Sequence, residues 1–339
     1  MMTNSKIKVG LVGFGYWGPN LARNFRASDL YDVRWIADIS EKRLAVAKRE
    51  YPEARATSDY REVIGDAEVE LIAIATPTHS HYEICKESIG RKKHVLVEKP
   101  LADSVERAEE LIYSARSQNR ILAVDHSFLF SAPVRKLKDI IDSGEIGDVF
   151  FINSERLNLG IIQSDVNVFW DLAVHDISII DYILGGKLPV SLIAEAEHYT
   201  QGLQHEFGTV SIRYPGKKVA NITVSWLSPI KTRRMMVVGS KKMVYFDDVH
   251  PDEKLKIIDK GVEYDTEKDK SLSPVYRWGD VVVPRIDNAE ALSREVAELY
   301  RAIREGGAFP SLGEDGVRIL KVLGAIDQSL LERKEIRLC

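Results

Sequence analysis

A lysine follows one apolar segment of the sequence at a position where packing gives no reason for a cation. Residues 94–100 read HVLVEKP, so Glu98 and Lys99 end a short run of branched side chains. In a parallel sheet this end of a strand lies at the carboxyl edge, where such sheets bind ligands. A lysine beside a second positive charge releases its proton more readily, which suits proton exchange with a hydroxyl group. Pro100 then fixes the chain direction, for which a cis Lys99–Pro100 bond is one means.

A second set of polar side chains recurs every four residues. Asn167, Asp171 and His175 are spaced i, i+4 and i+8 in NVFWDLAVHDISII, which places all three on one face of a helix. A histidine beside a carboxylate can accept a proton while the carboxylate orients the ring and stabilises its charged form. The alternative is an ordinary surface ion pair, which is common at this spacing. The otherwise apolar character of the segment favours the catalytic interpretation.

Near the N-terminus, residues 13–18 read GFGYWG and match the G-x-G-x-x-G pattern between an apolar run and a helical segment. The first glycine permits a tight turn, the second lets the backbone approach a diphosphate, and the third lets the helix pack on the strand. Pro19 suits the first turn of that helix, whose N-terminus would face the diphosphate. The alternative is a simple turn, but the position of the motif predicts a dinucleotide site.

An acidic residue follows the next apolar run at the distance that this site requires. Asp38 lies about twenty residues past the motif, where a carboxylate accepts hydrogen bonds from ribose hydroxyls. A carboxylate there repels a 2′-phosphate, so NAD is favoured over NADP. Ser40, Lys42 and Arg43 are a competing signal, because they could instead hold that phosphate. Asp38 could also be only a turn residue at a strand end.

Polar loop residues follow a third apolar run in the sequence ATPTHSH, residues 75–81. They would lie at the same carboxyl edge and could line the cofactor, although His79 and His81 could equally well begin a helix. Together these signals predict one cofactor site. Its expected residues are Gly13, Gly15, Tyr16, Trp17, Gly18, Asp38, Ile39, Arg43, Thr76, Pro77, His79, His81, Glu98 and Lys99.

The elements that would position these residues follow from hydrophobic periodicity. Through the first third of the chain, short apolar runs alternate with helical patterns, which predicts a doubly wound parallel sheet. The expected strands are residues 7–15, 33–40, 70–77, 94–100 and 121–128.

After about residue 128 two helical segments, APVRKLKDIIDSG and NVFWDLAVHDISIIDYILGG, precede five strand-like runs within residues 191–248. Short turns between these runs predict a mostly antiparallel sheet. Residues 260–286 carry scattered charges and prolines and are expected to form an irregular loop. Two helices, 291–306 and 314–334, close the chain. The fold class is therefore α/β, with a Rossmann domain over residues 1–126 and an α+β domain with a large sheet over residues 127–339.

Composition limits the function classes. A chain of 339 residues fits two domains, and its net charge of −4 argues against nucleic-acid binding. No apolar run could span a bilayer, and the N-terminus has no secretory pattern, so we expect a cytoplasmic protein without a membrane partner. Cys85 and Cys339 have neither disulfide-framework nor zinc-ligand spacing, so no metal site is expected.

The segments GFGYWGPN, VDHSFLF, the EKP strand end and the Asp-x-x-x-His helix together resemble the Gfo/Idh/MocA oxidoreductases. The resemblance covers nearly the whole chain in order and spacing. Within that family, the segments around residues 158–179 and 225–248 are most similar to the branch of UDP-N-acetylglucosaminuronate 3-dehydrogenases and related nucleotide-sugar 3-ketoreductases.

This resemblance implies an NAD(P)-dependent dehydrogenase that moves a hydride between nicotinamide C4 and a sugar carbon. It implies that Lys99 and His175 are the acid/base residues, with Asp171 paired to His175 or to a sugar hydroxyl. Which of the two groups transfers the proton stays open. It also implies a homodimer or homotetramer built on the second domain. The expected substrate-binding residues are Arg156, Asn158, Gln163, Asn167, Trp170, Asp171 and His175.

We therefore expect oxidation or reduction of a nucleotide-linked sugar, at C3 of a UDP-N-acetylhexosaminuronate, in polysaccharide biosynthesis. One alternative is a dehydrogenase of a free polyol or sugar such as inositol, which needs no diphosphate site. An alternative of another class is a non-catalytic NAD-binding sensor, which the presence of both Lys99 and His175 disfavours.

Overall fold

The computed structural model describes residues 5–163, 166–201, 204–264 and 274–338, and Cys339 lies outside them. The chain divides into two compact units. The first contains residues 1–131 and 289–320, and the second contains residues 132–288 and 321–339. The predicted division into residues 1–126 and 127–339 differs from this one, because the chain returns to the first unit near its C-terminus.

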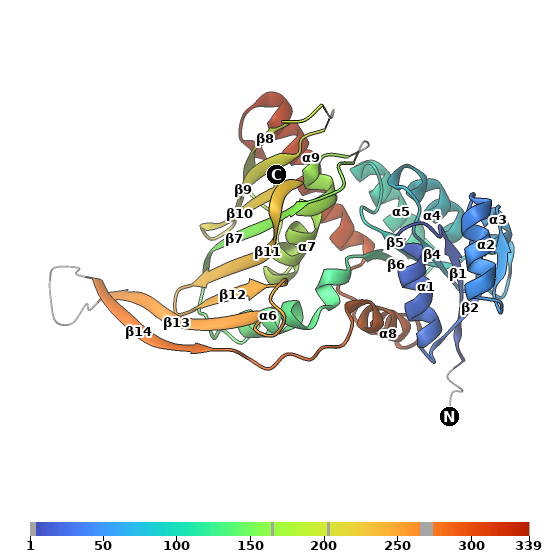
Figure 1. The fold of residues 1–339 in the computed structure, drawn as a ribbon, viewed down its shortest axis with the longest axis horizontal. Helices are drawn as coiled ribbons and strands as arrows, with labels where there is room; N and C mark the ends of the chain where they lie inside the picture. The colour runs from blue at the N-terminus through green and yellow to red at the C-terminus, as the bar shows by residue number, and fades with distance from the viewer. Residues whose placement is uncertain (1–4, 164–165, 202–203, 265–273, 339) are drawn as a thin grey trace. The chain divides into compact units, whose positions relative to one another are not determined.

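Within the described residues, six parallel strands form the sheet of the first unit in the order β3-β2-β1-β4-β5-β6 (Figure 1). This is the strand order of a Rossmann fold, whose switch point falls between β1 and β4. The strands are β1 (Ile7–Val12), β2 (Tyr31–Ala37), β3 (Arg55–Thr57), β4 (Leu71–Ile74), β5 (His94–Glu98) and β6 (Leu122–Asp125). All residues of β4 and β6 are buried, as expected for strands covered on both faces.

Helices connect these strands and lie along the faces of the sheet (Figure 1). They are α1 (Gly18–Ala27), α2 (Glu41–Glu50), α3 (Tyr60–Gly65), α4 (His81–Gly90) and α5 (Val105–Ser117), with short 3₁₀ turns η1 (Thr78–Ser80) and η2 (Ser127–Phe130). The returning segment adds α8 (Ala291–Glu305) and the start of α9 (Gly313–Glu332). The contacts that fasten α8 to the unit include a hydrogen bond from the Tyr31 hydroxyl to the Val296 carbonyl at 2.6 Å and an ion pair between Arg23 and Glu290, the residue before the helix, at 2.7 Å.

The second unit is built on a sheet in the order β14-β13-β12-β11-β7-β10-β9-β8-β15 (Figure 1). Every neighbouring pair is antiparallel except β7 and β10. The strands are β7 (Val149–Leu159), β8 (Ser191–Glu197), β9 (Phe207–Tyr214), β10 (Lys218–Ser225), β11 (Leu227–Gly239), β12 (Met243–Asp247), β13 (Leu255–Tyr264), β14 (Pro274–Val282) and β15 (Ile336–Arg337). The unit also holds α6 (Ala132–Asp142), the π-helical turn η3 (Phe169–Ala173), α7 (Val174–Ile183) and the end of α9.

The expected irregular loop over residues 260–286 is wrong for residues 260–264 and 274–282, which are strands, whereas residues 283–286 form neither a strand nor a helix. Residues of β13 and β14 pair antiparallel there, from Ile257 opposite Val282 to Tyr264 opposite Pro274. The charges that suggested a loop belong to an edge strand, where they meet solvent rather than a core. Residues 265–273 of the predicted loop lie outside the described residues.

Sequence periodicity also missed β7, the strand that joins the two halves of the second sheet. Its central residues alternate between the two faces, and the side chains of Ile152, Ser154 and Arg156 point to the covered face and are buried. Because two of these three are polar, the strand lacks the apolar alternation that identifies most half-buried strands.

Candidate active site

The glycine loop of the first unit follows β1 and leads directly into α1. Gly13 has a φ of +96°, and a Cβ on it would lie 2.5 Å from the Ala75 carbonyl oxygen. A Cβ on Gly18 would lie 2.1 Å from the Gly13 carbonyl oxygen. Both positions therefore require glycine, for the turn and for the close approach of helix to strand that the motif predicts.

The carboxylate of Asp38 ties the end of β2 to this loop. Oδ2 accepts a hydrogen bond from the Phe14 N–H at 2.7 Å, and Oδ1 accepts one from the Ser40 N–H at 2.8 Å. Arg43 lies 3.6 Å away, and the Asp38 side chain is 3% exposed. Two carboxylate oxygens offer about four acceptor positions, so both retain capacity for ribose hydroxyls. The residues present fit the adenosine end of a dinucleotide.

A surface pocket of about 600 Å³ lies beside this loop. Its walls are Phe14, Gly15, Tyr16, Pro19, Ser40, Lys42, Arg43 and Val46. Tyr16 in its wall and Ile39, which precedes the wall residue Ser40 in the sequence, are 90% and 91% exposed. Large apolar side chains left this open next to a glycine loop are surfaces that a bound cofactor can cover.

The loops after β4 and β5 are joined by His81, the first residue of α4. Its Nδ1 lies 2.9 Å from the Pro100 carbonyl oxygen, and its Nε2 lies 2.8 Å from the Thr76 carbonyl oxygen. The ring is buried, and burial lowers its pKa below the ordinary value. His81 thus lies between the Thr76 and Pro100 carbonyls and donates its single N–H to one of them, while His79 is exposed in η1.

Lys99 lies at the carboxyl end of β5, followed by a cis bond to Pro100 as the sequence suggested. The structure surrounds this strand end with residues that periodicity did not single out. Asp125 ends the neighbouring strand β6, directly opposite Glu98 in the parallel register. Its Oδ2 accepts a hydrogen bond from the Trp17 indole at 2.6 Å, so the glycine loop and the strand end that carries the lysine are linked.

In the second unit, Asp171 and His175 lie on one continuous helical segment, but the segment is not a regular α-helix. Asp171 belongs to the π-helical turn η3, and His175 belongs to the first turn of α7. Such π turns are frequent at functional sites. The Asp171 carboxylate accepts a hydrogen bond at 2.9 Å from the indole of Trp226, which is 1% exposed. Trp226 therefore orients Asp171, a role that the sequence did not reveal.

Two of the expected substrate residues are engaged inside this unit. Asn167 donates from Nδ2 to Asp327 at 2.9 Å, and Trp170 donates from Nε1 to the same carboxylate at 2.7 Å. Asn167 Oδ1 accepts from the backbone N–H of Phe169 at 3.0 Å and so caps the start of η3. These contacts fix the helical segment and occupy polar groups of Asn167 and Trp170 that could otherwise bind a substrate.

Arg156 is placed differently from its expected role as a ligand for a carboxylate or diphosphate. It is 3% exposed and its Nε donates to Asp176 at 2.6 Å, with Ser154 donating to the same carboxylate at 2.6 Å. This buried pair ties β7 to α7 one residue past His175, and the role of Arg156 as a substrate ligand stays a prediction. Asn158 and Gln163 are half-buried on β7 and just beyond it.

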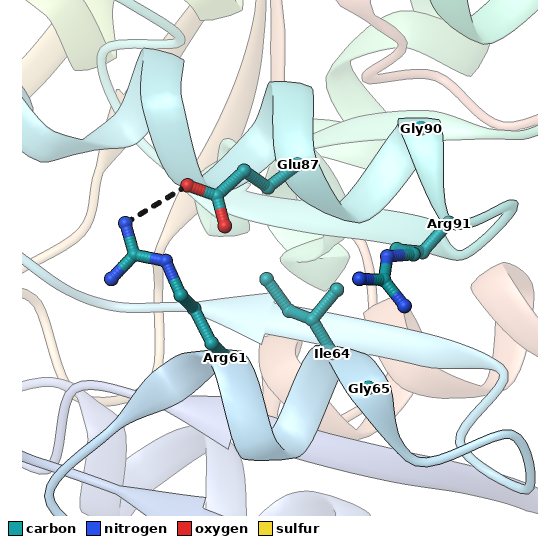
Figure 2. Close-up of a pocket in the computed structure, with 6 residues that line it drawn as sticks. All are labelled: Arg61, Ile64, Gly65, Glu87, Gly90 and Arg91. Carbon is teal, nitrogen blue, oxygen red and sulfur yellow. Dashed lines mark hydrogen bonds and ion pairs between the residues drawn. The ribbon is translucent and has the colours of Figure 1, made fainter.

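A second pocket, of about 260 Å³, lies in the first unit between α3 and α4. Figure 2 shows its six lining residues, with the Arg61–Glu87 ion pair of 3.2 Å at one side. None of the expected site residues lines it. Among the residues described here, no group of three or more His, Cys, Asp or Glu side chains could hold a metal ion. In that same part of the chain, no helix is both long and apolar enough to cross a membrane.

Two segments match known families. Residues 7–126 match a family described as an oxidoreductase family with an NAD-binding Rossmann fold, and residues 134–245 match the GFO/IDH/MocA C-terminal domain. Scyllo-inositol 2-dehydrogenase (NADP(+)) IolW of Bacillus subtilis is 25% identical over 98% of this chain and 96% of its own length. The uncharacterised oxidoreductase YrbE of the same organism is 27% identical over 54% of this chain, which spans 55% of that protein's length.

Among solved structures, UDP-N-acetylglucosamine 3-dehydrogenase GnnA from Acidithiobacillus ferrooxidans is similar with a TM-score of 0.82. The similarity covers 96% of this chain and 98% of that one at 22% identity. At this level of identity the likeness shows a shared fold.

Proposed function

The chain belongs to the Gfo/Idh/MocA oxidoreductase family, and from this premise we propose that it oxidises or reduces a nucleotide-linked sugar. It is an NAD-dependent dehydrogenase acting on CH–OH groups, with NAD bound by the first unit. The proposed reaction centre is C3 of a UDP-N-acetylhexosaminuronate or a related sugar. The main support for the proposal is the position of Lys99, directly after β5. There Glu98 lies opposite Asp125 of β6, and Asp125 accepts a hydrogen bond from the Trp17 indole.

Bound NAD would supply a carbon that accepts a hydride from the sugar carbinol. The protein's own part is to hold the reactants and to move one proton. Lys99 takes the hydroxyl proton in the oxidation and returns it in the reduction, with His175 as the second acid/base group. Asp171, oriented by Trp226, binds a sugar hydroxyl or orients His175. Gly13, Gly18 and Asp38 hold the cofactor, as the loop geometry supports.

Support for a nucleotide-linked sugar comes from the fold shared with a protein named for UDP-N-acetylglucosamine. A specific observation favours a second candidate, because one relative that matches over nearly its whole length is named as a scyllo-inositol 2-dehydrogenase. An inositol dehydrogenase needs hydroxyl ligands but no site for a diphosphate, and Arg156, the expected diphosphate ligand, is buried with Asp176.

The test mixes near-stoichiometric protein and NAD with UDP-sugars, dTDP-sugars, scyllo-inositol and myo-inositol, and follows NADH absorbance and product mass. Reduction of NAD with UDP-N-acetylglucosaminuronate alone, with loss of two hydrogens from the sugar, is the expected result. Reduction with the inositols instead would transfer the protein to the polyol candidate. If the protein binds NADH but forms none with any of these compounds, the proposal is contradicted for the oxidation direction. The matching keto-sugars then test the reduction.

We also propose that the second unit forms a homodimer or homotetramer. The β14 edge of its sheet exposes a row of large apolar side chains, among them Tyr276 at 66% and Trp278 at 77%. An apolar edge strand of this kind is a ready template for a further protein surface. A second copy of the chain is the occupant that its family resemblance implies.

A further inference from the structure

Three carboxyl groups from distant parts of the sequence meet at the strand end of the first unit. Glu98 ends β5, Asp125 ends β6 and Glu295 lies in α8, within the segment that returns near the C-terminus. Asp125 is 3% exposed and Glu295 is fully buried. Three like charges could not be kept this close in the interior of a protein, since even a single unpaired buried charge is very costly.

The contacts of these groups show how the charge is avoided. Glu98 lies opposite Asp125 in the register of β5 and β6, and side-chain hydrogen bonding with Asp125 is among the causes that raise the pKa of both Glu98 and Glu295. An ionised carboxylate only accepts hydrogen bonds, so each of these two bonds needs a proton on one partner. Asp125 could supply a proton to only one of them. The trio therefore holds at least one proton on a glutamate, and two protons satisfy both bonds while Asp125 accepts from each side.

Three of the oxygens in this trio have no donor from elsewhere among the described residues. Over the described residues, no N–H or hydroxyl group donates to either oxygen of Glu295 or to Oδ1 of Asp125. Burial and the neighbouring Asp125 raise the pKa of both Glu98 and Glu295 well above the usual range of a glutamate. Lys99 opposes this shift in the pKa of Glu98, and Glu298 adds to it in the pKa of Glu295.

The nearby histidine does not take these protons. His126 follows Asp125 and is 1% exposed, and neither ring nitrogen has a hydrogen-bond partner among the described residues. Burial, with a smaller contribution from Lys99, lowers the pKa of His126 to about 3. At neutral pH the ring is therefore neutral, and the protons stay on the carboxyl groups.

The position of the trio gives it a function. Asp125 accepts the indole N–H of Trp17, which lies in the glycine loop immediately before α1. Glu98 accepts the backbone N–H of Lys99 through Oε2 at 3.1 Å. One end of the trio therefore holds the loop that binds the cofactor phosphates, and the other holds the backbone of the proposed acid/base lysine.

We propose that Glu295 is a positioning residue of the dinucleotide site, whose protonated carboxyl group donates a hydrogen bond to Asp125 and so fixes the acceptor that holds Trp17 and Glu98. The functional half of this statement rests on the proposed function. The proton content does not, because it follows from the contacts of the trio alone.

The test compares Glu295→Gln, whose amide N–H can replace the carboxylic proton, with Glu295→Ala, which has no donor. Glu305→Gln is the matched control, because Glu305 is an exposed glutamate at the end of the same helix. NADH binding is titrated by fluorescence at pH 8. We expect the affinity of Glu295→Gln and Glu305→Gln to stay within about threefold of wild type, and that of Glu295→Ala to fall about tenfold or more. Equal losses in Glu295→Gln and Glu295→Ala would overturn the proposal, since they would mean that an ionised carboxylate is needed.

Infrared spectroscopy in D₂O at the same pH measures the proton content directly. We expect the C=O stretch of protonated carboxylic acids in wild type and in Glu305→Gln, and a weaker band in Glu295→Gln. This comparison does not require Glu295→Ala to fold. Absence of the band from the wild-type protein would overturn the proposal. If wild type showed the band but did not bind NADH, the proposed function would fail while the shared protons remained.

Discussion

Individual backbone contacts decide whether the glycine loop can form. Gly18→Ala would place a methyl group 2.1 Å from the Gly13 carbonyl oxygen, which can be relieved only by moving α1 away from β1. Overpacking of this kind costs about 1–3 kcal/mol of folding free energy. We expect that loss in urea unfolding, together with at least a tenfold weaker NADH affinity.

Gly65→Ala is the control for this substitution. Gly65 ends α3, and a Cβ built on it meets nothing within 4 Å. We expect NADH affinity and stability close to wild type. Equal effects of the two substitutions would show that the crowding at Gly18 is not what matters.

A buried protonated glutamate makes stability depend on pH in a defined direction. Because the folded-state pKa of Glu295 is raised above 4.5, its contribution to stability is fully present below about pH 4.5. It is lost as the pH rises toward the folded-state pKa, since the unfolded chain releases the proton first. Glu295→Gln removes this titration. The free energy of unfolding of the variant minus that of wild type should therefore increase with pH above 4.5, by at most about 1.4 kcal/mol per pH unit.

Denaturant unfolding of both proteins between pH 5 and pH 8 checks this prediction. The comparison reports the titration of Glu295 with its partners in the trio, because the titrating groups outside the trio are common to both proteins. A difference that stays constant over this range would mean that the glutamate titrates normally in the folded protein.

Residue types alone revealed the parts of the site that depend on local geometry. Gly13 and Gly18 could be predicted because a tight turn and a close helix–strand approach restrict a single position each. Asp125 and Glu295 could not be predicted in this way. Asp125 is 108 residues from its partner Trp17, and Glu295 is 170 residues from its partner Asp125. Nothing in a local pattern distinguishes a glutamate with such a partner from a solvated one.

Among the contacts between elements, the buried ion pair of Arg156 and Asp176 fixes the position of α7, which carries His175, relative to β7. The side chains of Arg156 and Asp176 are 3% and 4% exposed, and their N···O distance is 2.6 Å. Removing one partner of such a pair leaves the other charge buried, which costs about 3–5 kcal/mol. We expect Asp176→Ala to lose that much stability in denaturant unfolding and to lower the rate of turnover as well.

Glu155→Ala provides the comparison for Asp176→Ala. Glu155 pairs with Arg234 at 2.6 Å, but both side chains are more than a third exposed, so the loss should be about 0–1 kcal/mol. If the two substitutions cost the same, the buried pair does not anchor the helix.

The elements of the first sheet were easier to predict than those of the second. Strands β1, β4 and β5 are covered on both faces and read as continuous apolar runs. In contrast, β7 buries the polar Ser154 and Arg156, and β14 is exposed along almost its whole length. The polar residues of β7 are buried because Arg156 forms an ion pair, and β14 is an uncovered edge strand. A search for apolar periodicity detects neither feature.

At the scale of the whole molecule, the chain order of the two units is interleaved, because residues 289–320 return to the first unit. A consequence is that the dinucleotide unit should not fold from residues 1–131 alone. That fragment would lack Glu295 as well as Val296, whose carbonyl accepts the Tyr31 hydroxyl. Circular dichroism should show a fragment of residues 1–131 to be less stable than one in which residues 289–320 are joined to it. Equal stability of the two fragments would contradict this.

The proposed oligomer makes a separate prediction. Trp278→Glu places a charge on the exposed β14 edge, where the wild-type indole is 77% exposed. If that edge lies between copies of the chain, light scattering after size-exclusion chromatography should give a lower mass for the variant than for wild type. A wild-type protein that is already monomeric at micromolar concentration would contradict the proposed oligomer.

Lys99 is proposed to take the proton of the oxidised hydroxyl, and a single-turnover comparison isolates that step. Single-turnover NADH formation is measured for wild type, Lys99→Met and the control Lys48→Met, which replaces an exposed lysine of α2. The substrate is the UDP-sugar or inositol that reduces NAD in the substrate panel. We expect a rate about 10²–10⁴-fold lower for Lys99→Met, with NADH affinity nearly unchanged and Lys48→Met like wild type. A wild-type rate in Lys99→Met would contradict it.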